Sequence, residues 1–220
     1  MKKTLRQLFS LLVRRLKIKR YFKSHKVRKL QIGSGNNTLK DWLNTDLNPI
    51  KESIFLDVKR RLPFEDCAFQ YIFCEHLIEH LTYQEGGFLL EECFRVLEPG
   101  GKIRIATPNF QFLVELYTST KNKLQSRYII WAMNKFLPNT KIYEDTFVIN
   151  NFFQAWGHKF IYDFKTLKHI LNKARFINVV RYNMGESSDT NLRGIESHGK
   201  HISDEFNKLE TMVVEAEKPI

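Results

Sequence analysis

The sequence predicts a three-layer α/β sandwich around a mostly parallel seven-stranded sheet, with the last strand antiparallel. From residue 27 onward, short apolar runs of β-strand character alternate with amphipathic helical segments, the order that parallel sheets with crossover helices produce. The first of these runs leads directly into a turn that contains two glycines. A chain of 220 residues with ten glycines and six prolines can bury one sizeable core, so we expect a single domain.

Seven apolar runs between turn signals supply the expected strands. They span residues 29–32, 42–47, 53–56, 69–74, 102–106, 176–182 and 211–216. We expect the last two to pair antiparallel at the sheet edge. Amphipathic helices are expected over residues 83–97 and 164–174; a Pro-Gly-Gly turn at residues 99–101 closes the first, and Asp163 is placed to cap the second.

The stretch between the fifth strand and the last helix is rich in aromatic residues and poor in glycine. We interpret residues 110–155 as a helical cap inserted into the domain, with a helix expected over residues 110–136. The expected organisation is therefore an N-terminal helix over residues 1–27, followed by one α/β domain over residues 28–220 that carries this cap.

The formal net charge of +11 belongs to the N-terminal segment. Residues 1–29 contain twelve of the 35 Lys and Arg and no acid, so the remaining 23 basic and 24 acidic residues nearly cancel. Leucines and a phenylalanine recur there at helical spacing, which predicts a basic amphipathic helix. Two interpretations stay open: the helix adheres to an anionic membrane surface, or it packs on its own domain with a solvated basic face. Because the rest of the chain is close to neutral, we expect no nucleic-acid partner.

The length of the apolar runs and the spacing of the cysteines indicate the cellular compartment of the protein. The apolar runs of the N-terminal segment are too short for a membrane span or a signal peptide. Cys67, Cys74 and Cys93 show no CxxC spacing and leave an odd count, which suits a reducing compartment. We expect a cytoplasmic protein, peripheral on the inner membrane face if the helix adheres there, and three buried apolar cysteines.

A turn and two carboxylates follow the first three expected strands. Gly33-Ser34-Gly35 comes after the first strand, Asp46 ends the second and Asp57 follows the third. Since the carboxyl ends of parallel strands share one edge of a sheet, these groups describe an adenosine-shaped crevice with a carboxylate for the ribose hydroxyls. The alternative is that the glycines only form a turn and the aspartates only cap helices.

Four stretches of the chain resemble one enzyme family. They are Gly33-Ser34-Gly35, Leu62-Pro63-Phe64-Glu65-Asp66, Cys74-Glu75-His76-Leu77-Ile78-Glu79-His80-Leu81 and Arg95-Val96-Leu97-Glu98-Pro99-Gly100-Gly101. Together they make residues 28–110 similar to the class I S-adenosylmethionine-dependent methyltransferases, in particular to those of type 11. The resemblance implies a Rossmann-like fold, S-adenosyl-L-methionine as cofactor and transfer of its methyl group.

Later stretches resemble a narrower group. Trp156-Gly157-His158-Lys159, Gly185-Glu186-Ser187 and Gly194-Ile195-Glu196-Ser197-His198 are similar to a subgroup of predicted methyltransferases associated with cell-surface polysaccharide synthesis. This resemblance implies a small-molecule or glycan acceptor, with O-methylation of a sugar or glycan precursor as the expected reaction.

The resemblance also implies which residues meet the cofactor. The expected set comprises Gln31, Gly33, Ser34, Gly35, Asp46, Leu47, Asp57, Val58, Cys74 and Glu75. Within it, the glycines lie beside the methionine part, Asp46 beside the ribose and Asp57 beside the adenine. Gln31 stands where the family usually carries an acid, so a hydrogen bond to the glycine loop is expected there in place of a charge.

Histidines are the candidate bases for an acceptor hydroxyl. His76 and His80 follow the fourth expected strand, next to where the donor methyl is expected, while His158 and His198 come from the distal half. A neutral imidazole is suited to this task near pH 7. The alternative for each histidine is a structural role.

Two other functions stay open. His76-Leu77-Ile78-Glu79-His80 has the HxxEH spacing of zinc peptidases, but a strand runs directly into it and no third ligand follows at helical spacing. In a milder form, His76, Glu79 and His80 hold a divalent ion, because they resemble the ExxEH metal site of some quinone O-methyltransferases. A nucleoside-binding module without turnover is the second alternative, since Gln31 removes a charge. The preferred interpretation is a methyltransferase without a metal.

Overall fold

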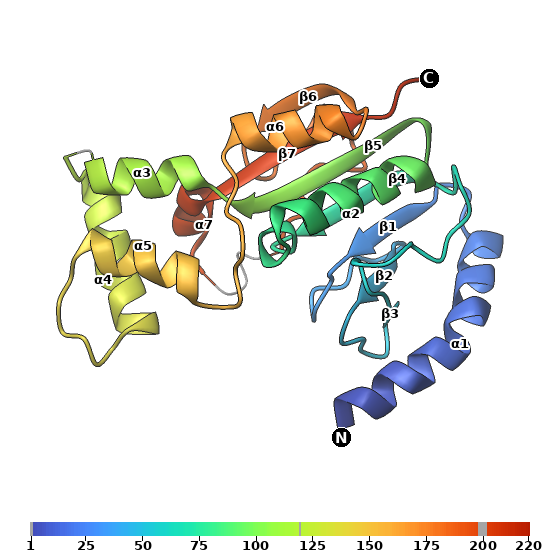
Figure 1. Ribbon diagram of the computed structural model, residues 1–220, viewed down its shortest axis with the longest axis horizontal. Helices are drawn as coiled ribbons and strands as arrows, with labels where there is room; N and C mark the ends of the chain where they lie inside the picture. Colours follow the sequence, from blue (N-terminus) through green and yellow to red (C-terminus); the bar gives the residue numbers. More distant parts are fainter. Residues whose placement is uncertain (1, 119, 198–201) are drawn as a thin grey trace.

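The computed structural model describes residues 2–118, 120–197 and 202–220, and its framework is one seven-stranded sheet (Figure 1). The strands are β1 (Lys29–Ile32), β2 (Leu43–Asp46), β3 (Ile54–Phe55), β4 (Phe69–Glu75), β5 (Leu97–Pro108), β6 (Ile177–Tyr182) and β7 (Thr211–Glu217). They lie in the order β3-β2-β1-β4-β5-β7-β6, with β7 antiparallel to both of its neighbours and the other pairs parallel. The predicted Rossmann-like sheet with an antiparallel last strand is confirmed.

The helices pack mainly against one face of this sheet and extend beyond one of its edges. They are α1 (Lys2–Ser24), α2 (Tyr83–Val96), α3 (Phe110–Thr118), α4 (Lys123–Phe136), α5 (Asp145–Gln154), α6 (Phe164–Lys173) and α7 (Asp204–Glu210), with a short 3₁₀ helix, η1 (Ile78–His80), after β4. α2 begins at a capping box: the Thr82 side chain accepts from the Glu85 N–H at 3.2 Å, and the Glu85 carboxylate accepts from the Thr82 N–H at 2.9 Å. Asp163 caps α6, as predicted, by accepting from the Thr166 N–H at 2.7 Å.

The chain departs from the sequence prediction directly after α2. The helix was expected to run to Leu97 and residues 99–101 to form a turn, but β5 begins at Leu97, which pairs with Phe69. The Gly100 N–H also bonds to the Lys218 carbonyl oxygen at 2.9 Å. Pairing with β4 and with the C-terminal segment lengthens this strand, and local residue preferences carry no information about such partners.

The cap also differs from the prediction. The single helix expected over residues 110–136 is divided into α3 and α4, because the Asn122 side chain forms a capping box with Gln125 and starts a new helix there. α5 and α7 were not predicted, and α7 has only seven residues, too few for a clear periodic pattern. α3, α4 and α5 lie together beyond the carboxyl ends of β1 and β5 (Figure 1), so they stand over the edge where the site is expected.

The two faces of the sheet are covered differently. Leu30, Ile72 and Ile103 belong to the main core cluster, in which the sheet packs against α2 and α6 (Figure 1). Phe73 and Val213 point to the opposite face, where Leu192 covers them. The third layer of the sandwich is therefore formed there by the irregular segment 183–197.

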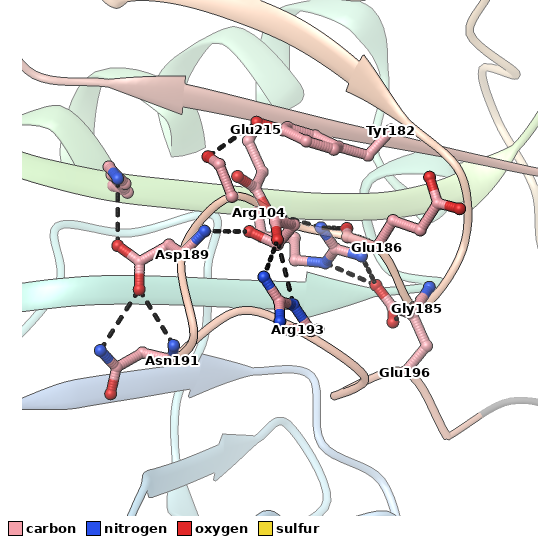
Figure 2. A network of polar contacts seen from close by, with 12 residues as sticks. Arg104, Tyr182, Gly185, Glu186, Asp189, Asn191, Arg193, Glu196 and Glu215 are labelled. Atoms are coloured by element: carbon pink, nitrogen blue, oxygen red, sulfur yellow. Dashed lines mark hydrogen bonds and ion pairs between the residues drawn. The ribbon is translucent and has the colours of Figure 1, made fainter.

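Figure 2 shows how segment 183–197 is held on the sheet. Arg104 of β5 is fully buried and donates to Glu196 Oε1 at 2.5 Å, to Glu215 Oε1 of β7 at 2.5 Å and to the Glu186 carbonyl oxygen at 2.9 Å. Further along, Lys102 pairs with Asp189 at 3.0 Å. Because a buried charge persists only with such partners, this network sets the position of the segment.

α1 changes its surroundings along its length. Tyr21 is buried and its hydroxyl donates to the Lys29 carbonyl oxygen at 2.9 Å, while Phe22 packs against the main core. Leu12 and Leu16 are 79% and 70% exposed. The last turns of the helix thus pack on the domain, whereas its middle presents leucines to solvent. Within the described residues, the helices are all too short or too polar to span a bilayer.

The prediction that all three cysteines are buried is wrong for Cys67. Its side chain is exposed, and the residue sits in a left-handed turn with φ of 53°, in which its N–H donates to the Arg95 carbonyl oxygen at 3.0 Å. Cys74 and Cys93 are buried as predicted, and burial raises the pKa of both thiols. Neither buried cysteine therefore has the character of a nucleophile.

Candidate active site

The glycine loop, residues 33–37, begins where β1 ends at the carboxyl edge of the sheet. The N–H groups of Gly33 and Ser34 donate to the Thr45 carbonyl oxygen at 2.9 and 3.0 Å. Gly33 has a φ of +71°, and a Cβ there would lie 2.2 Å from Leu77 Cδ1, so a side chain does not fit. The loop lines a pocket of about 220 Å³ together with Gln31, Glu75 and His76.

The two predicted carboxylates lie on neighbouring strands beside this loop. Asp46 Oδ2 accepts from the Gly35 N–H at 2.9 Å, and its Oδ1 accepts from the Asn48 N–H at 2.6 Å. The Leu56 N–H bonds to the Asp46 carbonyl oxygen at 3.0 Å, which places Asp57 at the same edge. The glycine turn and both aspartates are thus brought together. Of the adjoining residues, Leu47 is half exposed and Val58 packs against the main core.

Gln31 supports the glycine loop from inside the sheet. It is buried, its Nε2 donates to the Asn37 carbonyl oxygen at 2.9 Å, and its Oε1 accepts from the Leu39 N–H at 3.1 Å. A carboxylate could not donate the first of these bonds. The hydrogen bond that was expected between Gln31 and the glycine loop is therefore present, and it requires an amide at this position.

Glu75 connects the pocket to segment 183–197. Its carboxylate accepts from the Ser197 N–H at 3.0 Å and from the Ser197 hydroxyl at 2.9 Å. Ser197 directly follows Glu196, which is bound by Arg104. The buried network of Figure 2 therefore ends beside the glycine-loop pocket.

The partly buried His76 pairs with the fully buried Glu79 at the end of β4. His76 has a left-handed backbone with φ of 46°, and its Nδ1 lies 3.2 Å from Glu79 Oε1. The Thr107 hydroxyl donates to Glu79 Oε2 at 3.0 Å. Burial lowers the pKa of His76, but the hydrogen bond and charge of Glu79 outweigh it and raise the pKa overall. Burial likewise opposes ionisation of Glu79, yet His76 keeps the pKa of that carboxyl below its usual value.

His80 and His158 meet next to this pair although they are far apart in sequence. Their ring centroids are 5.1 Å apart, and His158 Nδ1 lies 2.6 Å from the Phe152 carbonyl oxygen. Burial lowers the pKa of His158. The three predicted histidines, His76, His80 and His158, therefore gather around Glu79. The fourth candidate, His198, lies outside the described residues.

An aromatic cavity of about 440 Å³ lies between these histidines and the cap. Its aromatic walls are Tyr128, Trp131, Phe136, Phe152 and Trp156. The Tyr128 hydroxyl donates to the carboxylate of Glu210, which also lines the cavity, and burial raises the pKa of Glu210. Sequence reasoning missed this pair, because it joins α4 to α7 and no spacing pattern relates the two.

The zinc-peptidase arrangement is not what the HxxEH stretch forms. His76 sits in a left-handed turn and the helical part is only the short η1, so the two histidines do not share one face of a helix. The ligating atoms that do converge in the described part of the chain belong to Glu79, His80 and His158, all within 4.8 Å of one another. His158, from the end of the cap, takes the place expected for His76.

Comparison with known proteins identifies the fold. Residues 30–105 match the family model described as a methyltransferase domain, of type 11. A chain in the complex between the Haloferax volcanii Trm112 methyltransferase activator and the putative methyltransferase superimposes with a TM-score of 0.52 and 13% identity, covering 92% of this chain and 89% of that one. The protein has the fold of the S-adenosylmethionine-dependent methyltransferases.

Two further solved structures have the same fold. A SAM dependent methyltransferase from Archaeoglobus fulgidus has a TM-score of 0.50 and 20% identity, covering 97% of this chain and 94% of that one. A possible histamine N-methyltransferase from Thermotoga maritima has a TM-score of 0.50 and 13% identity, covering 90% and 87%. No curated protein matches the chain. The matched domain contains the glycine loop, both aspartates and the first two histidines.

Proposed function

We propose that the protein is an S-adenosylmethionine-dependent methyltransferase in which His76 separates a donor pocket from an acceptor cavity. The observation that carries this proposal is that His76 lines both the glycine-loop pocket and the aromatic cavity. Methyl transfer requires a donor and an acceptor held in line with little water between them. Two pockets that meet at one side chain supply such an arrangement.

The glycine-loop pocket suits the methionine end of the cofactor. When bound, S-adenosylmethionine supplies an electrophilic methyl group on a sulfonium. Gly35 leaves the backbone open to close approach, because nothing lies within 4 Å of the position that a Cβ would take there, and the Glu75 carboxylate borders the same pocket. Asp46 retains acceptor capacity for ribose hydroxyls, because a carboxylate offers about four lone-pair sites and two amides use it. We assign the adenine side to Leu47, Asp57 and Val58.

We propose that the acceptor is a hydroxyl group of a sugar or glycan precursor. Trp131 and Trp156 give the cavity flat apolar walls for a ring, and Glu210 offers a carboxylate to accept hydroxyl hydrogen bonds. An acceptor hydroxyl must lose one proton during transfer, and the imidazoles of His76, His80 and His158 are the candidate bases. The lowered pKa of His158 keeps its ring neutral near pH 7 and able to accept that proton.

Calorimetric titration with S-adenosylmethionine and S-adenosylhomocysteine tests the proposal. The chain should bind both with micromolar affinity, and Gly35→Ala, where a Cβ would meet no protein atom within 4 Å, should weaken binding by at least about tenfold, or about 1.4 kcal/mol. Gly100→Ala is the matched control: its φ is +75°, but its nearest neighbour is Ile220 at 3.8 Å, away from the site. The control measures the cost of placing an alanine in a left-handed conformation, so any further loss of affinity is due to the change in the pocket.

The outcomes distinguish a sugar methyltransferase from a nucleoside-binding module and from an amine methyltransferase. A folded chain that binds neither nucleoside contradicts the proposal. Binding without transfer of labelled methyl to any of a panel of sugars and sugar nucleotides indicates a nucleoside-binding module. Transfer to an amine and not to a hydroxyl keeps the methyltransferase and removes the sugar assignment.

We further propose that α1 holds the enzyme on an anionic membrane surface. Leu12 and Leu16 project into solvent beside Arg15 and Lys19, which are also exposed, and each basic side chain near such a surface adds about 1 kcal/mol. Leu12→Gln combined with Leu16→Gln should abolish co-sedimentation with vesicles that contain phosphatidylserine. Val114→Gln, at an exposed apolar residue of α3, is the control. Equal sedimentation of all three proteins would remove the membrane role.

A further inference from the structure

Two imidazoles and one carboxylate meet at the base of the aromatic cavity. The ligating atoms of Glu79, His80 and His158 all lie within 4.8 Å of one another. Glu79 and His80 belong to η1, whereas His158 follows α5 at the far end of the cap. The set exists only because the cap folds back onto the carboxyl edge of the sheet.

His158 is oriented by a backbone group. Because a carbonyl oxygen can only accept, Nδ1 of His158 is the donor in its 2.6 Å bond to Phe152. This bond leaves the Nε2 lone pair for a ligand. Metal-binding histidines usually carry such a bond to a carbonyl or carboxylate on the other ring nitrogen.

Glu79 is held by side chains and by the backbone. Its two carboxylate oxygens meet His76 Nδ1 at 3.2 Å and the Thr107 hydroxyl at 3.0 Å. Its carbonyl oxygen accepts from the N–H groups of Lys159 and Phe160 at 2.7 and 3.2 Å, which ties the end of the cap to η1. Ligating carboxylates are commonly fixed by outer partners of this kind.

We propose that Glu79, His80 and His158 bind a divalent transition-metal ion of the zinc class. Two imidazole nitrogens and one carboxylate oxygen are the donor set of catalytic zinc sites, which keep a further position for water or substrate. All three residues line the aromatic cavity, so that position opens toward the acceptor. The catalytic role of the ion rests on the proposed methyltransferase function, whereas metal binding itself does not.

A divalent ion beside the acceptor changes how the proton leaves. It lowers the pKa of an adjacent hydroxyl, so the proton passes to water near neutral pH. The acceptor oxygen forms its bond to the methyl carbon, and the carbon–sulfur bond breaks with both electrons staying on sulfur. The products are a methyl ether, neutral S-adenosylhomocysteine and one proton. In this arrangement His80 and His158 act as ligands, and His76 is a positioning residue for Glu79.

Titration of the chelator-treated protein with Zn²⁺ and Co²⁺ tests this inference. One equivalent of Zn²⁺ should bind, and one equivalent of Co²⁺ should give the visible absorption of a protein-bound ion. His80→Ala and His158→Ala should each weaken Zn²⁺ binding by about 100-fold, and His76→Ala by about tenfold through the loosened carboxylate. His169→Ala, at an exposed position of α6, should leave binding unchanged.

The results have distinct meanings. Absence of a stoichiometric Zn²⁺ site, or binding that survives both His80→Ala and His158→Ala, overturns the metal site. His80 and His158 are only partly buried, so we expect both variants to fold. S-Adenosylhomocysteine binding and methyl transfer that persist in chelator, with no Zn²⁺ bound, overturn the catalytic role of the metal and retain the methyltransferase. Zn²⁺ binding without nucleoside binding retains the metal and overturns the proposed function.

Discussion

Segment 183–197 and the cap formed by α3, α4 and α5 border the candidate site from different sides and are held in different ways. The segment is held on the sheet by buried charges, with Arg104 between Glu196 and Glu215. The cap is held by apolar packing, in a cluster of its own centred on residues such as Leu116 and Tyr128. An ion pair is satisfied in one geometry, whereas apolar contacts tolerate adjustment. We therefore expect a fixed wall beside the glycine-loop pocket and an adaptable wall around the aromatic cavity.

The largest expected loss of stability is in the Arg104 network, which holds segment 183–197 on the sheet. Arg104→Met leaves the Glu196 and Glu215 carboxylates buried without their cation, which should lower the free energy of unfolding by about 3–5 kcal/mol. Urea denaturation at neutral pH measures this loss of unfolding free energy. Adding Glu196→Gln and Glu215→Gln to Arg104→Met should recover part of the loss, because the uncompensated charges are then gone. A loss below about 1 kcal/mol would mean that the network does not hold the segment.

A somewhat smaller and more local effect is expected in the cap. Leu116 is fully buried in the cap cluster, and Leu116→Ala should cost about 3 kcal/mol through the cavity it leaves. Hydrogen exchange should speed up in α3, α4 and α5, with β1, β4 and β5 protected as before. Equal loss of protection in the sheet would show that the two regions unfold together and would weaken the comparison.

The buried carboxyl group of Glu210, which pairs with the Tyr128 hydroxyl in the cavity wall, should give a pH-dependent effect. Burial raises the pKa of Glu210 above its unfolded value, so its contribution to stability is present at low pH and is lost as the pH rises through the folded pKa. Glu210→Gln removes that loss and should stabilise the chain by on the order of 1 kcal/mol at pH 8. The difference from the natural chain should shrink toward pH 4, as followed by thermal unfolding. A difference independent of pH would place the effect in packing.

The smallest effect is expected where the cap carries a surface ion pair. Arg127 and Glu205 join α4 to α7, and both side chains are largely exposed. Arg127→Ala should change the free energy of unfolding by less than about 1 kcal/mol. Added salt should reduce even that difference, because exposed charges are screened. A loss comparable to that of Arg104→Met would contradict the distinction between buried and exposed charges drawn here.

Local sequence patterns predicted the order of the strands along the chain and the residues that meet around the glycine loop. The strands are marked by apolar runs, and the parallel order places their carboxyl ends at one edge, so Gly33, Asp46 and Asp57 could be expected together. The same patterns failed at Leu97, where strand pairing and not local preference sets the start of β5. They failed at Cys67 as well, because residue type alone does not tell that this position lies in an exposed turn.

The aromatic cavity is formed by segments that lie far apart in the sequence and that no periodic pattern connects. The HxxEH spacing predicts a role for His76 and Glu79. His158 reaches Glu79 only because the end of the cap folds back onto η1. The Tyr128–Glu210 pair and the Arg104 network likewise join residues from separate elements. Spacing along a chain predicts which face of an element a side chain occupies, whereas the partner it meets there depends on how the elements pack.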